Sequence, residues 1–235
     1  MTQDRKNGLI IGILYIVAAV TSVIAVVFYQ SVLSEQWYMS AANGLDAKVL
    51  IGVLNDVCLV GAAIGTAVML FPYLRRWNEH IALGYLCFRY MEAVFIAIGL
   101  VSILGLLHLS VHYEEGNLAS EYLHAAGLLL QSFHRWTFML GPNLMLGLNT
   151  LMYSYLLYKT GLVPRKLALF GMVTAVMVFI GGLLDMFGIV DPISTAKGII
   201  ALPVGVYEMS LAIWLIGKGF HKQNLEKLKR GKRKG

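Results

Sequence analysis

Apolar runs of about 20 residues recur along the whole sequence, and they restrict the chain to a narrow class of folds. A helix needs about 20 such residues to cross the hydrocarbon core of a bilayer. The composition agrees, because only 14% of the residues are charged, against about 25% in soluble domains. We therefore predict an all-α, polytopic membrane protein with six transmembrane helices. The predicted spans cover residues 8–33, 46–71, 80–107, 136–158, 166–188 and 196–217.

The runs follow one another closely, so we expect one membrane domain over residues 1–217 and a basic tail over 218–235. Arg5 and Lys6 precede the first run as they would in a signal peptide. That run is too long for one, so we interpret it as an uncleaved first span. Residues 121–135 either extend the fourth helix outward or lie along the interface. Pro142, which cannot donate a backbone hydrogen bond, should kink that helix.

The distribution of basic residues predicts the orientation of the spans. Most of the 19 lysines and arginines fall before the first span, in the second and fourth loops, and after the last span. Cytoplasmic loops carry an excess of Lys and Arg, so both termini should lie in the cytoplasm.

Charged side chains occur deep inside three of the apolar runs, and an asparagine lies in a fourth run. Arg89 and Glu92 lie three residues apart in the third span, which places them on one helix face. Asp56 and Glu208 lie at similar depth in the second and sixth spans, and Asn143 lies in the fourth. Ionised groups at this depth are costly unless they are paired or functional. We expect these five residues to form a binding site for a polar ligand, an ion or a proton.

Two interpretations of this set remain open. In the first, the three acids exceed the one base, so the site holds negative charge that a cation or proton would offset. In the second, Arg89 clamps Glu92 and Glu208, and the charges serve only assembly of the bundle.

A second constellation lies toward the outer side of the predicted bundle. His108 and His112 are four residues apart, a spacing that can place two imidazoles on one metal ion. His124, His134 and Asp185 fall on the same side of the membrane. These residues would suit zinc and a metal-activated water in an intramembrane hydrolase. The leading interpretation has no metal and no other cofactor there. Cys58 and Cys87 have no motif partner and suggest buried apolar residues.

The basic tail Lys218–Lys234 contains Glu226 as its only acid. Beside a membrane, such a segment favours anionic lipid headgroups as partners. We expect no nucleic-acid partner, and the sequence leaves any protein partner open.

Several motifs resemble a family of bacterial membrane proteins catalogued as domain of unknown function 4386 (DUF4386). They are Arg5-Lys-Asn-Gly-Leu-Ile-Ile-Gly-Ile-Leu-Tyr15, Leu83-Gly-Tyr-Leu-Cys-Phe-Arg89-Tyr-Met-Glu92, Gly161-Leu-Val-Pro164-Arg165, and Pro203-Val-Gly-Val-Tyr-Glu208 with the following segment to Phe220. The resemblance implies a six-span domain of the bacterial inner membrane. It implies no particular activity.

The leading hypothesis is a protein that binds or transports a small polar solute, cation or proton at a midplane charged site. No residue is assigned a catalytic role. The alternatives are a non-catalytic partner or sensory subunit held by a structural charge clamp, and the metal-dependent hydrolase described above.

Overall fold

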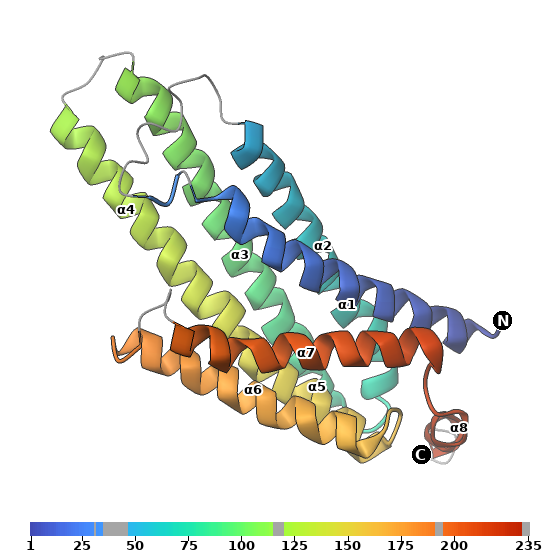
Figure 1. The fold of residues 1–235 in the computed structure, drawn as a ribbon. Coiled ribbons are helices and arrows are strands. Elements are labelled where there is room, and N and C mark those ends of the chain that lie inside the picture. Colours follow the sequence, from blue (N-terminus) through green and yellow to red (C-terminus); the bar gives the residue numbers. More distant parts are fainter. Residues whose placement is uncertain (31, 35–46, 115–119, 191–194, 232–235) are drawn as a thin grey trace.

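The computed structural model describes residues 1–30, 32–34, 47–114, 120–190 and 195–231 (Figure 1). Within these ranges the regular structure is helical, which confirms the predicted all-α class. The helices are α1 (Gln3–Phe28), α2 (Ala47–Leu74), α3 (Glu79–Glu114), α4 (Ser120–Phe138), the π-helix η2 (Met139–Met145), α5 (Leu146–Thr160), α6 (Arg165–Met186), α7 (Thr195–Gly217) and α8 (Lys222–Gly231).

Five helices in the described part of the chain are long and apolar enough to cross a membrane. They are Gln3–Ala25, Ala47–Leu74, Glu79–His112, Arg165–Met186 and Ile199–Gly217. Each overlaps a predicted span, so the protein is a multi-pass helical membrane protein. The third helix is longer than predicted, because α3 has 36 residues and measures about 54 Å at 1.5 Å per residue. A hydrocarbon core is only about 30 Å thick.

The predicted fourth span is divided among three helical elements. α5 has 15 residues and is too short to cross a bilayer alone, whereas η2 and α5 follow each other directly. Pro142, where the sequence predicts a kink, lies inside η2. Residues 121–135 lie in α4, which continues this helix toward the N-terminus and packs antiparallel to the C-terminal half of α3.

α1 packs against α2 along its length and against α7 near its beginning. A Cβ atom added to Gly12 would lie 2.7 Å from Ile216 Cγ1 and 2.8 Å from the Ala212 carbonyl oxygen. Only a glycine allows the two backbones to approach this closely. Figure 1 shows α1 and α7 close together at this end and diverging toward their other ends.

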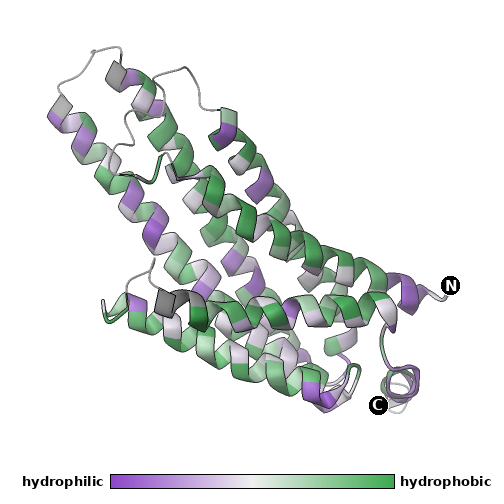
Figure 2. Cartoon of the chain, in the orientation of Figure 1, coloured by the Kyte–Doolittle hydropathy of each residue, from purple (hydrophilic) through white to green (hydrophobic). Residues whose placement is uncertain are grey.

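One end of the molecule, which we call the closed end, gathers the beginning of α1, the ends of α2 and α7, the turn between α5 and α6, and α8. Arg5 reaches across it to the end of α7, where its guanidinium donates to the carbonyls of Leu215 (2.7 Å), Ile216 and Gly217 (3.1 Å). Hydrophilic residues at the beginning of α1 and on α8 mark this end in Figure 2.

α8, which includes most of the described part of the basic tail, packs against the helical bundle. Leu225 is buried, and the Asn224 side chain donates to the Gly161 carbonyl at 2.8 Å. Lys229 Nζ lies 2.6 Å from Asp4 Oδ2 on α1. Lys232, Arg233 and Lys234 lie outside the described residues.

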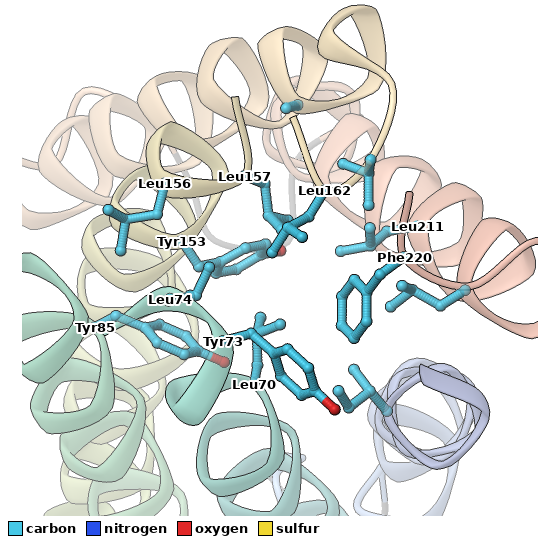
Figure 3. Close-up of a cluster of buried hydrophobic side chains, with 14 of the residues drawn as sticks. Leu70, Tyr73, Leu74, Tyr85, Tyr153, Leu156, Leu157, Leu162, Leu211 and Phe220 are labelled. Carbon is cyan, nitrogen blue, oxygen red and sulfur yellow. The ribbon is translucent and has the colours of Figure 1, made fainter. Parts of the chain in front are cut away.

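Two clusters of buried hydrophobic side chains stabilise the fold. The larger cluster lies toward the closed end and combines leucines with aromatic residues such as Tyr85, Tyr153 and Phe220 (Figure 3). The smaller cluster joins the end of α1, the beginning of α2 and the C-terminal half of α3, and it includes Tyr29 and Leu106. Along α3, residues 89–99 separate the two clusters.

Candidate functional site

A cavity of about 230 Å³ occupies the interval between the two hydrophobic clusters. Its wall comes from α1, α2, α3, α4, η2, α5 and α7. Small side chains on α1, including Ala18 and Ala25, leave room for it. Four charged side chains line it: Asp56, Arg89, Glu92 and Glu208. The structure therefore brings together four of the five site residues that the sequence predicted.

The pair Arg89 and Glu92 forms the best-bonded part of the cavity. Both side chains are buried, and Arg89 Nη1 lies 3.0 Å from Glu92 Oε2 and 3.3 Å from Oε1. The Asn149 amide donates to the same Oε2 at 2.6 Å, and Arg89 Nε donates to the Ala63 carbonyl at 3.4 Å. Glu92 thus has the ionic and hydrogen-bonding partners that a buried carboxylate needs.

Glu208, on α7, meets the same arginine in a looser arrangement. Its Oε1 lies 3.7 Å from Arg89 Nη1. The Glu208 side chain is nine-tenths buried, yet Oε1 has no hydrogen-bond partner among the described residues. An unsatisfied buried acceptor is costly, so this oxygen is the site's strongest unused binding group.

Asp56, on α2, is the third carboxylate of the cavity. It is 6% exposed, and it accepts hydrogen bonds from the Tyr29 hydroxyl at 3.0 Å and the Asn55 amide at 3.3 Å. No described arginine or lysine forms a salt bridge with it. The three carboxylates and one guanidinium leave the cavity with an excess of acidic groups.

The comparisons with known proteins identify a family without assigning an activity. A family model described as Domain of unknown function (DUF4386) matches residues 10–219. The chain belongs to the DUF4386 family. No curated protein and no solved structure matches it. The match confirms the resemblance recognised from the motifs. Every charged residue of the cavity lies inside the matched range.

Asn143, the fifth predicted site residue of this DUF4386 protein, does not line the cavity. Its amide donates to the Phe138 carbonyl at 3.1 Å. This bond ties the side chain to the backbone of its own helix, beside the proline in η2. Its side chain also packs against Gly182 on α6.

Sequence reasoning missed Asn149 and Tyr29 as partners of the cavity carboxylates. Asn149 lies near the middle of the predicted fourth span, at the depth expected for Glu92 in the third, so depth could have distinguished it from Asn143. Tyr29 contacts Asp56 from the end of α1, and no local pattern in the sequence predicts that contact.

Four buried tyrosines lie between the charged side chains and the closed end. Tyr153 packs against Tyr15, Tyr85 and Tyr207 with ring centroids 5.4–6.1 Å apart. The Tyr207 hydroxyl is 2.8 Å from Ser154 Oγ. Among the described residues, the hydroxyls of the other three have no hydrogen-bond partner. The cavity therefore has polar hydroxyl groups beneath it as well as charges within it.

The predicted histidine constellation is spread over the outer part of the molecule. The His108 and His112 rings are 4.4 Å apart, but His112 Nδ1 lies 3.1 Å from the His108 carbonyl. His134 lines the cavity beside the Gly99 carbonyl, and His124 is exposed. Asp185 lies 3.9 Å from Arg135. Within the residues that the structure describes, no three His, Cys, Asp or Glu side chains group to hold a metal.

Proposed function

We propose that this DUF4386 protein crosses the bacterial inner membrane six times, with both termini in the cytoplasm. The span that is not among the five candidate helices, the fourth along the chain, would be formed by η2 and α5, which together cover residues 139–160. Contacts at the closed end support the orientation, because they join the beginning of α1 to the end of α7 and to α8. These segments carry many of the basic residues that favour the cytoplasmic side.

We further propose that the cavity binds a small polar solute, a cation or a proton and carries it across the membrane. The observation that carries the proposal is Glu208, a buried carboxylate with an oxygen that accepts no hydrogen bond in the described structure. The acidic excess in the cavity favours a cation or proton over an anion.

The residues divide into two roles in this mechanism. Arg89, Glu92 and Asn149 form a fixed unit that holds the arginine in place. Glu208 binds the incoming positive charge, because among the described residues that line the cavity it is the acid with an oxygen that accepts no hydrogen bond. Asp56 adds a second acidic group to the same cavity, held in place by hydrogen bonds from Tyr29 and Asn55.

Cation-dependent stabilisation of the purified protein in lipid nanodiscs tests the binding step. A ligand that binds only the folded state at ten times its Kd raises the free energy of unfolding by about 1.4 kcal/mol. We expect Na⁺, K⁺ or tetramethylammonium, compared at constant ionic strength, to raise the Tm of the wild type. Protons compete for the same carboxylate, so the effect should weaken as the pH falls.

Glu208→Gln should abolish this stabilisation, whereas Glu226→Gln on the exposed face of α8 should preserve it. Equal responses from wild type and Glu208→Gln to every cation and to pH would contradict the proposal. Vesicles loaded with the pH dye pyranine then test transport, since a carrier of protons should change the dye signal under an imposed membrane potential.

A second function, a non-catalytic partner or sensory subunit, is favoured by the bonding of Arg89 to Glu92 and Asn149, which resembles a structural clamp. Under that alternative, Glu92→Gln and Glu208→Gln would both lower the folded yield. Neither variant would alter any cation response.

The exposed basic residues of α8 are proposed to bind anionic lipid headgroups. Lys222, Lys227 and Arg230 are exposed, whereas Leu225 points into the bundle. Replacing these three basic residues with glutamine should reduce the anionic lipid retained in mild detergent, as measured by native mass spectrometry. Unchanged retention would remove α8 as the lipid-binding segment.

A further inference from the structure

The exposed residues of the cavity lining lie on α1 and α4. Most of its lining side chains are buried or partly buried, but Ser22 on α1 is exposed and Phe138 on α4 is 50% exposed. These two residues mark the mouth of the cavity. Neither α1 nor α7 packs extensively against α4. Among the described residues, the contacts of α4 with this side include the Tyr29–His134 ring contact and the hydrogen bonds from Gln131 to carbonyls just beyond the end of α1.

The mouth faces the region that lipid would occupy. Ser22 belongs to the candidate span Gln3–Ala25, so it lies within the membrane and not beyond its surface. Its neighbour Val23 is 70% exposed. An exposed valine in a membrane span contacts acyl chains. A ligand that enters beside Ser22 would therefore arrive from the bilayer.

Apolar side chains form much of the cavity lining beside the carboxylates. Phe95 and Ile96 follow Glu92 by one turn on α3, and Leu59 and Leu146 face the same space from α2 and α5. Such walls match an apolar ligand body, as in most small-molecule sites. The carboxylates of Asp56 and Glu208 match a positive charge on that ligand.

We propose that the cavity takes up an amphipathic organic cation laterally from the bilayer. Its ammonium group binds at Glu208, and its apolar body lies along Phe95 and Ile96. This inference rests on the proposed function and specifies the substrate class of the same site. An inorganic ion or a proton would gain nothing from the apolar wall or from a mouth within the membrane.

Three small probes test the substrate class by calorimetry in nanodiscs, with empty nanodiscs as the blank. Benzyltrimethylammonium has the charge and an apolar body, tetramethylammonium has the charge alone, and neopentylbenzene is the neutral isostere of the first. We expect benzyltrimethylammonium to bind at least about tenfold more tightly than either of the others, because it alone uses both parts of the cavity. Glu208→Gln should remove most of that advantage.

A blocked mouth tests the route of entry. Ser22→Trp should slow benzyltrimethylammonium binding about tenfold or more, whereas Val23→Trp, one residue along on the lipid side, should leave it unchanged. Both variants are first checked for a native elution profile and helical content. Equal effects of the two tryptophan variants on binding would overturn lateral entry. If Ser22→Trp does not fold, the probe series on the wild type still tests the substrate class.

The outcomes separate this inference from the proposed function. Equal, Glu208-dependent binding of both ammonium ions would overturn the amphipathic substrate and preserve a cation site. Equal binding of neopentylbenzene would overturn the role of charge. Binding of none of the three probes would overturn the inference, and the inorganic-cation and proton measurements would still decide the proposed function.

Discussion

The closed end and the cavity each use one arginine to join helices, but in opposite ways. At the closed end, Arg5 donates to carbonyl oxygens at the end of α7 and satisfies backbone groups that a helix leaves unpaired. In the cavity, Arg89 faces the two carboxylates of Glu92 and Glu208 at 3.0 Å and 3.7 Å. The first contact completes a structure, whereas the second leaves an acceptor unused.

This difference shows where the molecule is built for stability and where it is built for binding. Glycines at the closed end allow α1 and α7 to touch, and α8 packs against the bundle there. Around the cavity, α1 and α7 have diverged (Figure 1), and four charged side chains line the space between the helices. A membrane interior penalises such an arrangement unless it serves a purpose.

The largest effect is expected from Arg89→Leu, which would leave Glu92 buried without its ionic partner. Removing one member of a buried ion pair costs about 3–5 kcal/mol, so the folded yield and Tm in mild detergent should fall sharply. The double variant Arg89→Leu, Glu92→Gln should recover only part of the loss, because residue 92 is then neutral whereas Glu208 still lacks its ionic partner. A single variant as stable as the wild type would show that the pair does not stabilise the bundle.

A smaller effect is expected from Gly12→Ala, which probes the closed end. The added methyl group would collide with the Ala212 carbonyl and Ile216, and such overpacking costs about 1–3 kcal/mol. Thermal unfolding measures it, with Gly205→Ala as the matched control, since a Cβ at Gly205 meets nothing within 4 Å. Equal Tm values for the two variants would mean that α1 and α7 do not touch as described.

The smallest effect is expected from Lys229→Gln, which breaks the ion pair with Asp4. Both side chains are substantially exposed, so the contact should contribute less than about 1 kcal/mol and weaken in high salt. Lys227→Gln on the same helix serves as the control. A loss larger than that of Gly12→Ala would make α8, and not the glycine contact, the main stabiliser of the closed end.

Much of the fold could be predicted from local sequence patterns. Apolar runs located five of the spans, since run length reports directly on membrane crossing. The three-residue spacing of Arg89 and Glu92 predicted their contact because helix geometry fixes it. Pro142 predicted a disturbed helix where η2 lies, because proline lacks the N–H that a regular α-helix uses.

What escaped prediction depends on contacts between distant segments. Asn143 seemed to belong to the site because it is polar and membrane-embedded, but its amide serves the Phe138 carbonyl beside Pro142. The hydrogen bond from Tyr29 to Asp56 and that from Asn149 to Glu92 depend on how separate helices are rotated against each other. The packing of α8 likewise follows from the buried position of Leu225 and not from the charge of the tail.

The contact of α1 with α7 has a consequence for how the protein is made. α1 leaves the ribosome first, but its partner helix is synthesised some 200 residues later, which takes about 10–40 s at typical elongation rates. During that delay the face of α1 that carries Gly8 and Gly12 cannot pack against α7. It must contact lipid, another helix or an insertion factor instead. Assembly of the closed end is therefore a late step, completed only when nearly the whole chain has been translated.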